Sequence, residues 1–341
     1  MEQLSNVVAN RVQAAPLGVR RIPADTDFVY VMRCDADYVA AQFAERIGVR
    51  DSLAAITAAY DRAVDRLATH VLSAFRTAYE RPAVDLLDAR EIHLRRLELI
   101  ASLGAGTVVS MDPLMESGAL ALAFSRCYRP GGEVFIEMIP RPGYPSLEAQ
   151  VAAIAAAAAG GPIIVVEDDF FTGDTLTTTL GTLLGDLLEN VVGVVAGTKV
   201  GLLEPSIPVL PAVRYRCEDG RDPLTKLDLG DPRDYLIGAS GLVCLLASGR
   251  LGRLPYVLPF VSPAARASIP AHAEGEFSRA ALQLSREFYD ELEKVIGRVV
   301  RLDATDPAFV SACNELLGLQ ADTPMGDVLD VVAEQKLTGI G

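Results

Sequence analysis

A single stretch, residues 163–180 (IIVVEDDFFTGDTLTTTL), most constrains what this 341-residue chain can fold into. It opens with Ile163–Val166, a short apolar run rich in β-branched residues, which is typical of a strand buried on both faces of a parallel sheet. Acidic residues follow at 167–169, then a Thr-Gly-Asp-Thr loop at 172–175, and apolar spacing over 176–188 predicts a helix. The stretch therefore predicts a strand, an acidic turn, a polar loop and a helix in direct succession.

The loop has the chemistry of an anion-binding site. A glycine at 173 lets backbone N–H groups close around an anion without a Cβ clash, and Thr172 and Thr175 add hydroxyl donors. The start of the following helix directs its positive end to the same place. The adjacent carboxylates of Glu167 and Asp168 suit sugar hydroxyls, or a hard cation held through its waters.

These residues resemble the phosphoribosyl-pyrophosphate (PRPP) binding motif of type I phosphoribosyltransferases. That motif is an apolar strand, an acidic pair, three residues and Thr-Gly-x-Thr/Ser, and here Glu167-Asp168, 169–171 and 172–175 match it without a gap. The resemblance implies an α/β fold with a Rossmann-like parallel sheet. The plain alternative is an ordinary buried strand followed by a solvated acidic turn.

The resemblance also implies roles for the residues of the motif. Glu167 and Asp168 would be the catalytic carboxylates, which hold the ribose 2′- and 3′-hydroxyls. The 5′-phosphate of PRPP would be wrapped by Asp169, Phe170, Phe171, Thr172, Gly173, Asp174 and Thr175. Mg²⁺ would bind mainly through the substrate, with Glu167 and Asp168 as its candidate protein ligands. The implied reaction is a Mg²⁺-dependent glycosyl (pentosyl) transfer from PRPP to a small-molecule acceptor, with release of pyrophosphate.

Two positions depart from the usual motif. Purine-type members often carry an aspartate, which can act as a base, where this chain has Phe171, and a phenylalanine moves no proton. Asp174 stands where glycine or lysine is more usual. Because a carboxylate directed into a phosphate site would repel the ligand, we expect Asp174 to face outward at the first helical turn.

The segment before the motif predicts part of a pyrophosphate site. Residues 107–111 read as a strand, 112–118 as a loop and 119–127 as a helix, in the order that type I members use. Ser117 and Gly118 are the candidate pyrophosphate contacts, and the alternative is a plain turn between strand and helix.

A second candidate follows the next predicted strand, 133–139. Arg141 lies there in a Pro/Gly-rich loop and is the local candidate for meeting a pyrophosphate, and the alternative is a plain connection with a solvated arginine. A helix over 147–159 then leads to the motif strand, which predicts parallel βαβ units with the site at the carboxyl ends of the strands.

The remaining sequence divides the chain into three parts. Residues 1–103 are expected to form a helical N-terminal extension or cap, with helices at 36–47, 53–79 and 88–103. Residues 104–200 form the phosphoribosyltransferase-like core. Residues 201–341 are expected to supply helical packing, a wall for the acceptor or a dimer surface.

The composition limits the kinds of partner that the protein is expected to bind. The net charge of −14 argues against nucleic-acid binding, which needs a basic surface. No apolar run has the length that a bilayer requires, so no membrane partner is expected. Five scattered cysteines without CxxC spacing predict reduced thiols and a cytoplasmic protein. Family analogy favours a homodimer.

Two other functions are compatible with one PRPP motif. The first is a non-catalytic regulatory protein that binds PRPP or a nucleotide. The second is a PRPP-forming synthetase, but those chains resemble two related domains in tandem, and this chain has a single motif.

Overall fold

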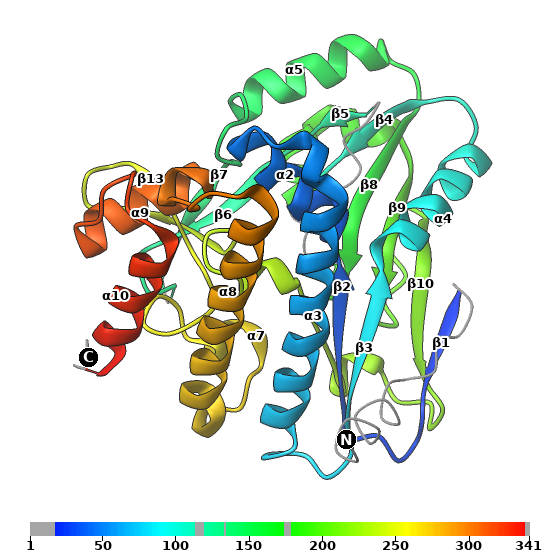
Figure 1. Cartoon of the computed structure of the whole chain (residues 1–341). Helices are drawn as coiled ribbons and strands as arrows, with labels where there is room; N and C mark the ends of the chain where they lie inside the picture. Colours follow the sequence, from blue (N-terminus) through cyan, green and yellow to red (C-terminus); the bar gives the residue numbers. More distant parts are fainter. Residues whose placement is uncertain (1–17, 113–118, 133, 174–178, 338–341) are drawn as a thin grey trace.

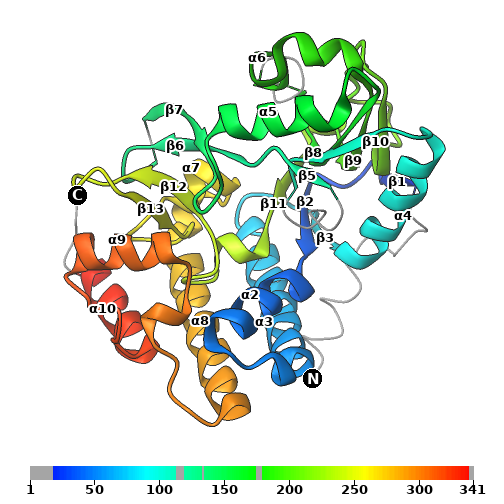
Figure 2. The same cartoon turned by 90° about the horizontal axis from the view of Figure 1, so that it is seen from above.

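Three sheets and the helices between them form the molecule in the computed structural model, which describes residues 18–112, 119–132, 134–173 and 179–337. Figure 1 shows the largest sheet on one side of the molecule and the C-terminal helices on the other. Figure 2, seen from above, shows the layers around that sheet. The helices α5 (Leu147–Ala158) and α6 (Gly181–Leu184) cover one face, and a smaller sheet lies across the other.

The largest sheet has six strands, all parallel, in the order β1-β10-β9-β8-β4-β5. Their bounds are β1 (Val19–Ile22), β4 (Thr107–Ser110), β5 (Leu120–Ala121), β8 (Ile163–Phe170), β9 (Val191–Lys199) and β10 (Val209–Cys217). Without β1, the strands stand in the order 2-1-3-4-5 of chain succession, one of the common orders of doubly wound α/β sheets. The expectation of an α/β fold with a parallel central sheet is confirmed at this level.

A second, three-stranded sheet packs against the first. It is also parallel, in the order β11-β2-β3, with β2 (Phe28–Cys34), β3 (Pro82–Asp88) and β11 (Leu227–Gly230). One face buries Val29, Val31 and Leu227 against β10 and α4 (Ala89–Ser102). The other face packs on α3 (Leu53–Phe75) and α8 (Glu274–Ile296), which lie side by side in Figure 1.

The third sheet and the C-terminal helices complete the fold. The sheet has the order β13-β12-β6-β7, with β6 (Phe124–Tyr128), β7 (Phe135–Pro140), β12 (Leu242–Leu245) and β13 (Leu251–Leu254); only the β12–β6 pair is parallel. The helices α2 (Ala36–Ile47), α9 (Pro307–Leu317) and α10 (Met325–Leu337) share an apolar core with α3 and α8. The short helix α7 (Pro263–Ala267) precedes α8.

Several expected elements are in place, and five expectations need correction. Helices at 36–47 and 147–159 and the strands at 107–111 and 191–198 are confirmed within a residue or two. The segment 1–103 is not only helical, because it supplies β1 to the large sheet and β2 and β3 to the second. The helix expected at 119–127 is instead β5 and β6, since sheet pairing overrides the helix propensity of its alanines and leucines.

The other three corrections concern the motif, the helix after it and the strand before it. The acidic residues 167–169 do not form a turn, because β8 runs to Phe170 and stays paired with β9. After the motif, α6 is a single turn followed by a 3₁₀ segment at 185–190, and Gly185 has a positive φ of 52°. The strand expected at 133–139 is present as β7, but it lies in the third sheet, antiparallel to β6.

A buried ion pair ties the two parallel sheets together. Arg20 of β1 donates to Asp85 of β3 over 2.7 Å, and Tyr215 of β10 donates to the other carboxylate oxygen over 2.5 Å. Both Arg20 and Asp85 are buried. The pair therefore fixes the packing of one sheet on the other.

Removing Arg20 should destabilise the fold strongly. In Arg20→Ala, Asp85 loses its buried counter-charge and keeps only Tyr215, so we expect the free energy of unfolding to fall by about 3 kcal/mol. Urea denaturation measures the loss. The control is Arg21→Ala on the exposed face of the same strand, expected to change stability by less than about 0.5 kcal/mol. Equal effects of the two substitutions would contradict the role of the pair.

Candidate functional site

The candidate site lies at the point where the order of the large sheet reverses. The chain leaves β4 for β5 on one side and returns to β8 on the other side of β4. Asp112 follows the end of β4, and Glu167, Asp168 and Asp169 end β8, so four acidic residues meet there. In open α/β sheets, ligands bind in the crevice at such a switch point, beyond the carboxyl ends of the strands.

A buried arginine from the second sheet holds this acidic cluster. Arg33, at the end of β2, lies 3.6 Å from Asp112, 3.5 Å from Asp168 and 3.0 Å from Asp231, measured between charged side-chain atoms. Asp231 follows β11, the neighbour of β2. The carboxyl ends of both parallel sheets therefore meet at one guanidinium.

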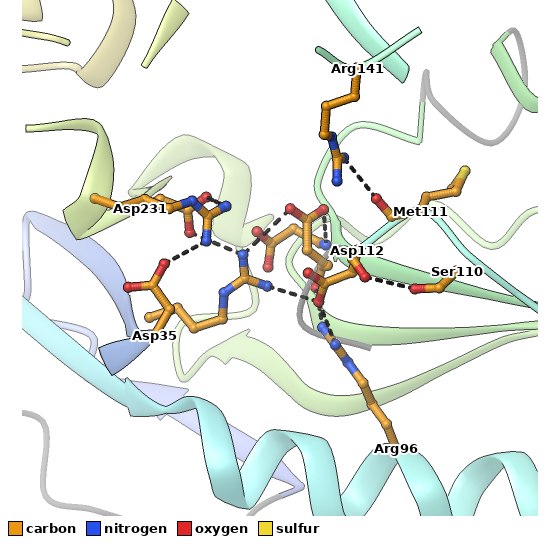
Figure 3. Close-up of polar contacts among 11 residues, drawn as sticks. Asp35, Arg96, Ser110, Met111, Asp112, Arg141 and Asp231 are labelled. Atoms are coloured by element: carbon orange, nitrogen blue, oxygen red, sulfur yellow. Dashed lines mark hydrogen bonds and ion pairs between the residues drawn. The ribbon is translucent and has the colours of Figure 1, made fainter. Parts of the chain in front are cut away.

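Two further arginines extend the network, which Figure 3 shows in close-up. Arg96 reaches from α4 to Asp112, with a nitrogen–oxygen distance of 2.5 Å. Arg233 pairs with both Asp35 and Asp231. These contacts orient the carboxylates by charge-assisted hydrogen bonds, which are stronger than neutral ones.

The protonation of the acidic residues follows from this crowding. Burial and the neighbouring charge of Asp168 raise the pKa of Glu167 well above its usual range, which favours its neutral form. Burial also raises the pKa of Asp169 to about 7, opposed by the charge of Arg33 and assisted by that of Asp168. The site thus holds two carboxyl groups that resist ionisation beside Asp168, whose side chain is 32% exposed.

The loop after β8 is tightly packed. Gly173 has a φ of 89°, and a Cβ there would meet a ring carbon of Phe170 at 3.0 Å and Leu203 at 2.9 Å. Phe170 is buried in the core, with the ammonium of Lys199 at 5.5 Å from its ring centroid. Phe171 is half-buried against the core between the two parallel sheets. The two phenylalanines are thus packing residues, and a phosphate-binding role for the loop falls to its backbone and hydroxyl groups.

Several predicted site residues lie outside the described part of the chain. These are Ser117 and Gly118 of the pyrophosphate segment and Asp174 and Thr175 of the motif. The described members Glu167, Asp168 and Asp169 are together at the end of β8, and Thr172 and Gly173 follow them in the chain.

Arg141 lies at the same site. Its guanidinium donates to the backbone carbonyl of Met111, next to Asp112, over 3.0 Å (Figure 3). The other terminal nitrogen, Nη1, is buried and has no hydrogen-bond partner among the described residues. Arg141 and Asp168 line one cavity of about 300 Å³. The arginine expected near a pyrophosphate is therefore beside the motif carboxylates.

Sequence reasoning missed the basic residues that hold the site. Arg33 and Arg96 belong to the segment expected to form an N-terminal extension, and Arg233 to the expected C-terminal part. One signal was available, because Arg33 and Asp231 stand at or just after the carboxyl ends of strands. Their convergence depends on the packing of two sheets, which a single sequence does not reveal.

Metal ligands, membrane-spanning helices and cysteines add little to the description of the site. Among the residues that the structure describes, no group of three or more His, Cys, Asp or Glu is arranged to hold a metal ion. Within the same residues, no helix has the length and apolar character needed to cross a membrane. The described cysteines Cys127, Cys217, Cys244 and Cys313 are free and buried.

Comparison of the chain with protein-family models, with curated proteins and with solved structures gives no match. The fold and the site together define an α/β protein with a doubly wound parallel sheet and a charged site at its switch point.

A glycine in β9 makes room for Arg96. A Cβ on Gly197 would collide with the Arg96 guanidinium and with the backbone oxygen of Asp168. In Gly197→Ala we therefore expect Arg96 to lose its place beside Asp112 and the free energy of unfolding to fall by about 2–3 kcal/mol in urea denaturation.

The matched control lies on the same strand. A Cβ on Gly193 would approach the movable end of the Leu103 side chain at 3.1 Å, and the backbone oxygen of Pro208 at 3.6 Å, which is an ordinary contact. Gly193→Ala should cost less than about 1 kcal/mol. A Gly197→Ala protein as stable as Gly193→Ala would show that the passage of Arg96 past β9 does not need a glycine.

The raised pKa of Asp169 predicts a pH-dependent stability. The pKa of Asp169 is about 7 in the folded protein and 3.8 in the unfolded chain, so the folded protein binds this proton more tightly. The resulting stabilisation of the fold is fully present below pH 4. That contribution, on the order of 4 kcal/mol, should be lost as the pH rises from 4 to 7. Asp169→Asn should flatten the dependence of the unfolding free energy on pH over this window. The exposed Asp186→Asn should keep the wild-type dependence, and parallel curves for wild type and Asp169→Asn would contradict the assignment.

Proposed function

We propose that this protein is a type I phosphoribosyltransferase, which transfers the 5-phosphoribosyl group of PRPP to a small acceptor and releases pyrophosphate. One observation carries the proposal: the acidic pair Glu167-Asp168 stands at the carboxyl end of a parallel strand at the switch point, and Asp168 lines a cavity with Arg141. The strand order 2-1-3-4-5 supports the same class, because such sheets bind phosphorylated ligands at this position.

The ribose would be held by the two carboxyl groups. Asp168 is the more exposed of the pair and can accept hydrogen bonds from sugar hydroxyls. Glu167, whose pKa is raised, can donate a hydrogen bond as well as accept one. As the bond from C1 to the pyrophosphate breaks, positive charge grows on the sugar, and the charge of Asp168 would stabilise it.

The leaving group needs positive charge on its side. The unpartnered Nη1 of Arg141 is a donor that a pyrophosphate oxygen could satisfy. The acceptor's nucleophilic atom forms the new bond to C1, and the pyrophosphate departs with the electrons of the broken C1–O bond. Because Phe171 cannot take a proton, the proposal requires an acceptor that is already nucleophilic.

The donor set fits Mg²⁺ held mainly through the substrate. Glu167 Oε2 is buried and has no hydrogen-bond partner among the described residues, and Asp168 is partly exposed beside it. Asp168 would reach the ion directly or through its waters, and Glu167 would do so after it gives up its proton. When bound, Mg²⁺ supplies positive charge to the pyrophosphate oxygens.

Binding of PRPP tests the proposal directly. Calorimetric titration of PRPP into the wild-type protein should show saturable binding that depends on Mg²⁺. Asp168→Asn should weaken it at least tenfold, because the amide loses the charge that favours the ribose hydroxyls and the metal. Asp186→Asn removes an exposed carboxylate from the β8–β9 connection and should bind PRPP as the wild type does.

The same experiment separates the alternatives. Binding followed by pyrophosphate release with an acceptor supports the transferase, whereas binding without release from any acceptor tested would favour a regulatory protein that senses PRPP. Folded wild-type protein that does not bind PRPP would overturn the proposal.

A further inference from the structure

The cavity that begins at Asp168 and Arg141 has a second basic wall. Arg46 of α2 and Arg253 of β13 line it, together with Asp306, the residue before α9. Both guanidiniums face the same oxygen of Asp306, over 2.7 Å from Arg253 and 3.6 Å from Arg46. The other oxygen of Asp306 accepts from the backbone N–H of Ala308 and caps α9. One carboxylate therefore serves two arginines and a helix end.

Positive charge without a counter-charge, and a hydrogen-bond donor without an acceptor, remain at this wall among the described residues. The Nε atom of Arg253 is buried and has no hydrogen-bond partner in the described part of the chain. At this wall Arg46 and Arg253 share the single negative charge of Asp306, so the three residues together carry one unit of positive charge. Unmet buried donors are costly unless a ligand satisfies them. A monoanion matches both the charge and the donor.

The rest of the lining limits the size and shape of that anion. Tyr38 and Tyr144 contribute aromatic surface, and Ser125 and Ser240 contribute hydroxyls. A volume of about 300 Å³ lies at the small end of ligand pockets. A small planar ring with one acidic group suits these dimensions, since the ring can pack on aromatic side chains and the carboxylate can accept from guanidinium groups.

We infer that this cavity binds the acceptor of the proposed transfer, and that the acceptor is a small aromatic or heterocyclic carboxylate read by Arg46 and Arg253. That the ligand is the acceptor rests on the proposed function, whereas the anion site itself is inferred from the cavity. It assigns a role to the extra parts of the chain, because Arg46 comes from the N-terminal segment and Arg253 from the C-terminal one.

Benzoate and its neutral isostere benzamide are the probes. Calorimetric titration into the full-length protein, with and without PRPP and Mg²⁺, should show benzoate binding at least tenfold more tightly than benzamide. Arg46→Gln should remove most of this difference by weakening benzoate alone, and it leaves the Arg253–Asp306 pair intact. Arg253→Lys keeps the charge but loses the Nε donor, so it should weaken benzoate without unfolding the protein.

The control is Arg50→Gln, which removes the same charge from an exposed side chain near the end of α2 and should change nothing. Equal affinity for benzoate and benzamide, or no saturable binding of benzoate, would overturn the inference. Tighter binding of phenyl phosphate than of benzoate would overturn the choice of a carboxylate. Arg46-dependent binding of benzoate by a protein that does not bind PRPP would keep the anion site and reject the transferase. PRPP binding without benzoate binding would keep the proposed transferase and reject the anion site.

Discussion

The structure depends on one buried guanidinium. Arg33 is almost fully buried and faces Asp112, Asp168 and Asp231, which come from three strand ends in two sheets. Burying so many charges is costly, and the cost is offset only while every partner is in place. The contact therefore does more than join two layers. It couples the position of the motif carboxylates to the packing of the second sheet, so the site exists only in the complete fold.

The same coupling explains the division of labour around the cavity. The strand with the motif supplies carboxyl groups. Arg33 and Arg96, which contact the acidic cluster, come from β2 and α4, whereas the cavity arginines Arg46 and Arg253 come from α2 and β13. A chain with a net charge of −14 can in this way present donors to an anionic ligand, because only the local arrangement counts at short range. The acidic surface and an anion-binding interior are compatible.

Local patterns predicted local structure well and the assembly poorly. The apolar run of β8, the apolar spacing of α3 and the Asp306 cap of α9 are short-range signals, and the sequence contains them in full. The structure of residues 119–127 depends on residues elsewhere in the chain. Their alanines and leucines favour a helix, but the segment forms β5 and β6 because it pairs with β4 and β7. The site divides in the same way. The motif could be read from its spacing, but Arg33 and Arg96 acquire meaning only through contacts across two sheets.

The strand at one edge of the large sheet, β1, precedes the other strands of that sheet in the sequence. β1 pairs with β10, so Val19 lies beside Arg214 and Ile22 beside Cys217. Loop closure over such a separation costs chain entropy before any pairing compensates for it, and contacts of this kind slow folding. During synthesis the first strand must wait for nearly two-thirds of the chain, and until it docks, β10 presents an open parallel edge. That edge is the natural place for a nascent chain of this protein to associate wrongly, and a helper that shields strand edges would act there.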